Sequence, residues 1–176
     1  MPDQKSSEPN SPLRFKIERS LHIPLLSSPV QYRLVEESST KIAVRLGEIL
    51  NAAKGLPGLC LCGQNQAYKV PSITQMALGI VFPNVPEAEA WASKQMYAFD
   101  WLSLSIIDES SIPADWYMHL YGDGNHKLSS SPPGFALDGS TLEVHVWDDK
   151  WLILIGERNL IEQTFGSLLT GFTVEE

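Results

Sequence analysis

Hydrophobic and polar residues alternate most clearly between residues 141 and 155, in the run TLEVHVWDDKWLILI. Alternation with a period of two is typical of a β-strand that buries one face. Two strand-like runs, of which the first alternates, flank Asp148, Asp149 and Lys150, and aspartate tolerates the backbone geometry of a tight turn. The pattern therefore predicts a β-hairpin, with one tryptophan on each side of its turn.

The two strands of this predicted hairpin differ in the polarity of their faces. In the first strand the aliphatic residues share one face, which we assign to the core, and the outer or groove face holds Glu143, His145 and Trp147. The second strand, residues 151–155, is apolar on both faces. Such a strand is either central in a sheet under helices or buried by a second chain. The pattern therefore favours a protein partner or self-association.

Further alternating or short apolar runs predict additional strands. Residues 73–82 also fit a helix, but Gly79 and the closing Ile-Val-Phe-Pro favour a strand. The runs WLSLSII (residues 101–107) and DWYMHLY (residues 115–121) are joined by a short connection. This connection predicts that the two strands form an antiparallel pair. The additional strands are predicted at residues 13–18, 30–35, 59–62, 73–82, 101–107 and 115–121.

Three segments carry apolar residues at helical spacing. The clearest follows Ser38 and Ser39, whose hydroxyls can cap the first turn, and it stops at Gly55. Asn84 can cap a second helix, which continues to about residue 99. The third helix closes the chain, with its apolar side chains between residues 161 and 172.

Together these elements predict an α+β domain: a mostly antiparallel sheet of about five to seven strands with about three helices packed mainly on one face. A chain of 176 residues with 43% hydrophobic residues fits a single domain. Residues 1–12 are mostly polar, proline or charged residues with little to bury, so they predict a flexible N-terminal tail. The single α+β domain is then residues 13–176.

The net charge and the cysteine content limit the partners and the cellular compartment that we expect for this protein. Thirteen basic and twenty-one acidic residues give a net charge of −8, and the basic residues form no run. This charge disfavours direct binding to nucleic acid. No apolar stretch approaches the roughly 18 residues needed to cross a bilayer, and the N-terminus lacks the hydrophobic centre of a signal peptide. With two cysteines in all, we expect a cytoplasmic protein without membrane contact.

No recognised nucleotide, metal or hydrolase motif occurs in the sequence. Cys60 and Cys62 form a Cys-x-Cys pair, but a zinc site normally needs about four ligands and no second pair exists. The run Gly-Asp-Gly-Asn-His-Lys starting at Gly122 lacks the alternating acidic ligands of a calcium loop. We therefore expect no catalytic residue, no metal and no cofactor, and we interpret both cysteines as core residues.

One surface could still bind a ligand or a partner. If strands 115–121 and 141–147 are neighbours, their tyrosine, histidine and glutamate side chains would line one polar and aromatic face. An ordinary solvent-exposed face is the alternative interpretation. Tryptophans of the hairpin extend the candidate set, because interfaces are enriched in tryptophan. The candidate partner- or ligand-binding residues are Tyr117, His119, Tyr121, Glu143, His145, Trp147 and Trp151.

Two functions follow as hypotheses. The preferred one is a non-enzymatic protein–protein interaction or accessory module that binds through the 141–155 hairpin face or the 122–138 loop. A variant of it is an acidic mimic of nucleic acid that occupies a nucleic-acid-binding partner. The alternative is a small-ligand or metal-binding enzyme with a site around His119, His145 and Glu143, in which histidine acts as general base or metal ligand.

Overall fold

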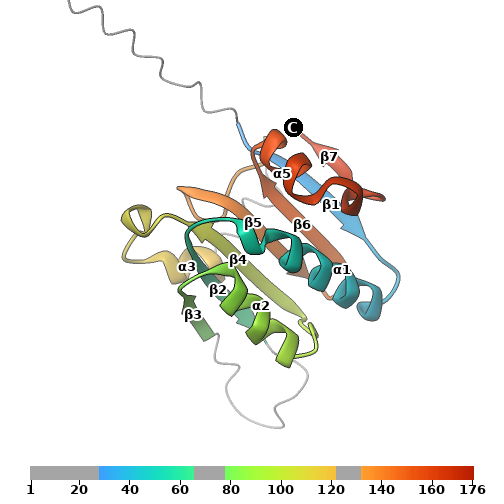
Figure 1. Ribbon diagram of the computed structural model, residues 1–176, viewed down its shortest axis with the longest axis horizontal. Coiled ribbons are helices and arrows are strands. Elements are labelled where there is room, and N and C mark those ends of the chain that lie inside the picture. The colour runs from blue at the N-terminus through green and yellow to red at the C-terminus, as the bar shows by residue number, and fades with distance from the viewer. Residues whose placement is uncertain (1–27, 66–77, 122–131) are drawn as a thin grey trace, which may run out of the picture.

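The computed structural model describes residues 28–65, 78–121 and 132–176. In this part of the chain, seven strands form one sheet in the order β3-β2-β4-β5-β6-β1-β7 (Figure 1). All neighbouring strands run antiparallel. The predicted α+β class and the predicted antiparallel sheet are therefore confirmed. The predicted tail and the predicted strand at residues 13–18 lie outside the described residues.

The predicted hairpin is formed by the two central strands β5 and β6. Trp147 lies directly opposite Trp151. Asp148 and Asp149 have φ angles of 52° and 43°, the left-handed conformation that a tight hairpin turn needs and that aspartate tolerates. The strands are β1 (Val30–Val35), β2 (Leu59–Asn65), β3 (Leu78–Phe82), β4 (Trp101–Ile107), β5 (Ser140–Trp147), β6 (Trp151–Gly156) and β7 (Thr173–Glu175).

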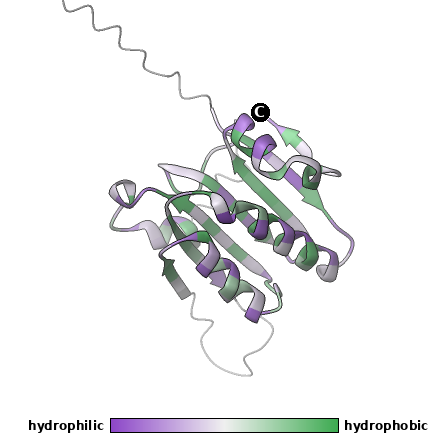
Figure 2. Cartoon of the chain, viewed as in Figure 1, coloured by the Kyte–Doolittle hydropathy of each residue, from purple (hydrophilic) through white to green (hydrophobic). Residues whose placement is uncertain are grey.

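Three helices, α1 (Ser39–Ala52), α2 (Val85–Lys94) and α5 (Arg158–Phe165), cover one face of the sheet (Figure 1). Both predicted caps are present, because Ser38 accepts a hydrogen bond from the Lys41 N–H and Asn84 accepts one from the Glu87 N–H. Beneath these helices, one residue in every two along the central strands contributes to the main core. Hydrophobic residues are concentrated along these strands in Figure 2.

The strand predicted at residues 115–121 is wrong. Trp116–Tyr121 is instead a short helix, α3. Trp116 and Leu120 are four residues apart and therefore share a helical face. Both pack into a second hydrophobic cluster, whereas Met118 is exposed. The predicted pairing of this segment with strand 101–107 is consequently also wrong, because β4 pairs with β2 and β5.

The apolar spacing predicts one closing helix, but the C-terminal segment consists of several shorter elements. Helix α5 ends at Phe165, and Gly166 follows with a φ of 47°, a conformation that glycine adopts without strain. A short 3-10 helix, Gly166–Leu169, comes next. The sequence pattern does not predict the last element, β7, which pairs with β1 at the edge of the sheet.

The second face of the sheet carries the candidate site residues. Residues that lie directly opposite one another on neighbouring antiparallel strands project to the same face. One row across this face reads Ser105, Glu143, Ile155 and Gln31, and the next reads Ser103, His145, Ile153 and Arg33. This face is therefore polar across β4 and β5 and aliphatic along β6.

Helix α3 and the segment before β5 pack against part of this second face. The backbone of Leu120 lies so close to Gly63 that a Cβ atom added to Gly63 would come within 3.2 Å of the Leu120 carbonyl oxygen. Phe135 packs against Ile153 and Ile155. Both isoleucines are 0% exposed. Beyond Trp151, strand β6 is thus buried on both faces within one chain, so its apolar pattern does not require a second chain.

Candidate functional site

A buried hydrogen-bond network occupies the polar part of the second sheet face, with Glu143 at its centre. The carboxylate accepts the backbone N–H of Ala136 and that of Leu137, each at 2.8 Å. The hydroxyl of Ser140 lies 2.9 Å from Glu143 Oε1, and Ser105 Oγ lies 2.6 Å from Ser140 Oγ. Because backbone N–H groups can only donate, these contacts hold the segment before β5 against the sheet.

His145 extends the same network to β4. Its Nε2 lies 2.9 Å from Glu143 Oε2 and its Nδ1 lies 2.8 Å from Ser103 Oγ. If Nε2 carries the proton and donates to the carboxylate, a neutral ring accepts the Ser103 hydroxyl at Nδ1. The order hydroxyl, imidazole, carboxylate is the connectivity that activates a serine nucleophile in hydrolases.

The solvent exposure of these residues determines whether they can act on a substrate. Ser103, Glu143 and His145 are each 0% exposed, whereas a nucleophile must reach its substrate. The parity of β5 predicted from the sequence is confirmed, because Glu143 and His145 do share the face opposite the main core. Their predicted position on an outer or groove surface is wrong, since the face is buried there. The network therefore acts as a structural anchor in this conformation.

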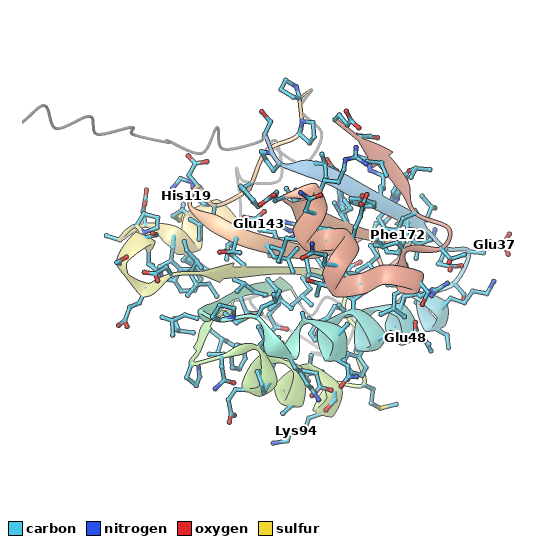
Figure 3. All side chains as sticks on the ribbon, turned by 45° about the horizontal axis from the view of Figure 1, so that its top comes forward. Glu37, Glu48, Lys94, His119, Glu143 and Phe172 are labelled. Atoms are coloured by element: carbon cyan, nitrogen blue, oxygen red, sulfur yellow. The ribbon has the colours of Figure 1, made fainter. Side chains whose placement is uncertain are left out.

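The three candidate residues of segment 115–121 do not join this network. His119 lies on the partly exposed side of α3, where its Nε2 is 3.2 Å from Asp115 Oδ2. Tyr117 sits over Gly79 of β3, and the side chain of Tyr121 lies outside the described residues. Figure 3 shows His119 on α3 and Glu143 on β5. The single surface predicted for the two groups depended on a strand that the structure replaces by a helix.

The remaining candidates for metal binding or reactivity are the other acidic residues, the histidines and the two cysteines. Among the described residues, no group of three or more His, Cys, Asp or Glu side chains is arranged to hold a metal ion. Cys60 and Cys62 are both buried in the main core. Burial raises the pKa of the Cys60 thiol to about 12 and that of Cys62 well above its usual range, so both stay protonated and unreactive at neutral pH.

The second sheet face becomes exposed at its hairpin end. There, Trp101, Trp147, Trp151 and Val35 form one row across four strands. Trp101 is buried, but Trp147 is 41% exposed and Val35 is 55% exposed. Trp151 is half-buried, and the guanidinium of Arg33 lies 5.4 Å from the centre of its ring. We call Trp147, Trp151 and Val35 the hairpin-end strip.

Acidic residues border this strip. The backbone N–H of Asp149 donates to the Asp100 carbonyl at 3.1 Å, which holds the hairpin turn against the start of β4. The Glu36 N–H donates to the Lys150 carbonyl at 2.9 Å and fixes β1 to the same turn. Burial, together with the carboxylates of Asp149 and Asp148, raises the pKa of Asp100. The strip is therefore a rigid, apolar surface with carboxylates along one border.

No protein family, curated protein or solved structure matches this chain. Its function must therefore be inferred from its own geometry. None of the helices in the described part of the chain is both long and apolar enough to span a membrane.

Four polar residues of the second face were not predicted as part of a site: Gln31, Ser103, Ser105 and Ser140. A signal for two of them exists, because the run WLSLSII places serines at two alternate positions of β4, 103 and 105. Alternating small hydroxyls in an otherwise apolar strand indicate a face with different chemistry from the core face. Their partners could not be predicted, since the strand opposite β4 was predicted wrongly.

Gln31 provides a test of how this face is stabilised. It is 0% exposed, and neither atom of its side-chain amide has a hydrogen-bond partner among the described residues. Replacing Gln31 with methionine keeps the volume and removes two desolvated polar groups. We expect Gln31→Met to raise the free energy of unfolding by about 1–3 kcal/mol, measured by chemical denaturation.

The matched control for this substitution is Gln163→Met on the exposed side of α5, which should change stability by no more than about 0.5 kcal/mol. A loss of stability in Gln31→Met would mean that the amide is paired in solution.

Proposed function

We propose that this protein is a non-enzymatic interaction module that binds another protein through the hairpin-end strip. The observation that carries the proposal is the row of Trp147, Trp151 and Val35, which crosses three neighbouring strands and is substantially exposed. Tryptophan is the residue type most enriched among residues that dominate binding energy. A surface held by a sheet also loses little conformational entropy when it binds.

The choice between the two predicted binding segments follows from their burial. The loop predicted at residues 122–138 is described only from residue 132 onwards. In that part, Ala136 and Leu137 are buried and hydrogen-bonded to Glu143. These residues hold the fold together, whereas Trp147 is available at the surface. The hairpin is therefore the better supported binding segment.

The alternative function, a small-ligand or metal-binding enzyme, has less support. Its three residues are divided between the partly exposed His119 on α3 and the buried pair Glu143 and His145. The Ser103 hydroxyl that accompanies His145 is itself buried. The geometry thus favours a binding surface over a reaction site.

Trp147→Ala is the direct test of the proposed function. A tagged wild-type protein and the variant are used to capture partners from the lysate of the native host, with recovery quantified by mass spectrometry. A partner that depends on the strip should be depleted by the variant, since losing a tryptophan at the centre of an interface costs about 2 kcal/mol or more, roughly thirty-fold in Kd.

The control is Met118→Ala, which truncates an exposed apolar side chain on α3, away from the strip. Size-exclusion chromatography with light scattering identifies the case in which the partner is a second copy. The proposal fails if the wild-type protein is strictly monomeric and recovers no partner, or if Trp147→Ala recovers the same proteins in the same amounts as Met118→Ala.

A further inference from the structure

We infer that the partner presents a basic, apolar segment. Its apolar side chains would contact Trp147 and Trp151, and an arginine or lysine beside them would be held by the carboxylates of Asp100, Asp148 and Asp149. This inference rests on the proposed function of the hairpin-end strip and specifies the chemistry of its partner.

The three aspartates form one border of the strip. Asp148 follows Trp147 directly in the chain, and Asp100 directly precedes Trp101, which lies opposite Trp147. The hydrogen bond from the Asp149 N–H to the Asp100 carbonyl joins the two segments. The carboxylates of Asp148 and Asp149 act on that of Asp100, so the three acidic groups lie near one another at the hairpin end of the sheet, where Trp147 is exposed.

These carboxylates have no cationic partner in the described part of the chain. The ion pairs there involve other acids: Lys41 pairs with Glu36 at 3.9 Å, and Arg33 pairs with Glu175 at 3.5 Å. Lys150, the cation of the hairpin turn, forms no ion pair with a described residue. An incoming cation would thus add an interaction that the described residues do not supply.

Electrostatics around the turn supports the same kind of partner. The raised pKa of Asp100 arises first from burial and then from Asp149 and Asp148, so the ionised carboxylates repel one another. A bound cation relieves this repulsion. The net charge of −8 also attracts a basic partner over a longer range. An acidic segment would be repelled by the turn carboxylates at short range and by the net charge at longer range.

The indole rings add a second way to recognise a cation. Arg33 already lies over the ring of Trp151 at 5.4 Å, within the range at which a guanidinium is attracted to an aromatic face. Trp147 lies directly opposite Trp151 on the neighbouring strand. Its exposed surface can accept a guanidinium of the partner in the same way, while the remainder of the strip contacts aliphatic side chains.

The test uses two short synthetic peptides, one alternating arginine with leucine and one alternating glutamate with leucine. Binding to the full-length chain is followed by isothermal titration calorimetry and by tryptophan fluorescence. We expect the arginine–leucine peptide to bind and the glutamate–leucine peptide not to bind. Added salt should weaken the binding, because the carboxylates are partly exposed and screened by ions.

The decisive variant is the double substitution Asp148→Asn and Asp149→Asn. Asparagine adopts positive φ at least as readily as aspartate, so the hairpin turn is preserved while its charge is removed. We expect a roughly tenfold loss of affinity for the arginine–leucine peptide. The matched control is Glu87→Gln with Glu109→Gln, which removes the same charge from exposed positions elsewhere and should change the affinity much less.

The outcomes separate this inference from the proposed function. Equal binding of both peptides, binding of neither, or equal effects of the two double variants would overturn the basic character of the partner. The proposed function would still stand if Trp147→Ala depleted a captured partner. If Trp147→Ala had no effect on capture or on peptide binding, both the function and the inference would fail.

Discussion

Replacing Glu143 with alanine is expected to lower the free energy of unfolding by about 3–5 kcal/mol. The substitution removes the acceptor of the Ala136 and Leu137 N–H groups and also the partner of His145 Nε2. All of these groups are buried, so each would lose a hydrogen bond without gaining full access to water. Chemical denaturation followed by circular dichroism measures the change.

Two comparisons make this result specific. Glu37→Ala removes an exposed carboxylate near the start of α1 and should change stability by no more than about 0.5 kcal/mol. In Glu143→Ala, hydrogen exchange of the amides of residues 136 and 137 should accelerate more than exchange in α1. An unfolding midpoint equal to that of wild type would show that the buried network does not hold this segment.

The hairpin could be predicted from the sequence because its information is local. Alternation in β5 and the paired aspartates at the turn each determine backbone geometry within a few residues. Parity then identifies which side chains share a face, and the structure confirms this for Glu143 and His145. Parity alone does not show whether a face is exposed, and that is where the prediction failed.

Segment 115–121 shows the limit of periodicity over a short run. Trp116, Met118 and Leu120 alternate with polar or aromatic residues, but Trp116 and Leu120 also lie at helical spacing. A run of seven residues is too short to distinguish the two periods. Leu120 of this helix packs closely against Gly63 on the sheet, a tertiary contact that no local pattern encodes.

The buried network could not be predicted because it depends on which strands are neighbours. Ser103 meets His145 only because β4 pairs with β5. A wrong assignment of segment 115–121 as the partner of β4 removes that contact from consideration. Polar contacts across a sheet therefore become predictable only after the strand order is known.

Strand β6 does not itself require a partner. Its apolar residues on both faces favoured a second chain, yet Ile153 and Ile155 are buried within the single chain. The feature that supports a partner is the exposed hairpin-end strip, which occupies the end of the same face. The candidate binding surface is therefore only the hairpin end of the second sheet face, and not the whole of that face.

Ile153→Ala tests whether one chain is sufficient to bury β6. Because Ile153 is 0% exposed on the second face and Leu154 is 0% exposed on the first, we expect Ile153→Ala and Leu154→Ala each to cost about 2–5 kcal/mol of stability. The free energy of unfolding, measured by denaturation at widely different protein concentrations, should be independent of concentration for both variants and for wild type. If a second copy buried the Ile153 face, the free energy of unfolding of the wild type would rise with protein concentration. The loss of stability in Ile153→Ala would then also depend on protein concentration, whereas the loss in Leu154→Ala would not. Concentration-independent costs on both faces would place β6 in the core of a single chain and leave the hairpin end as the part of its face that is free to bind.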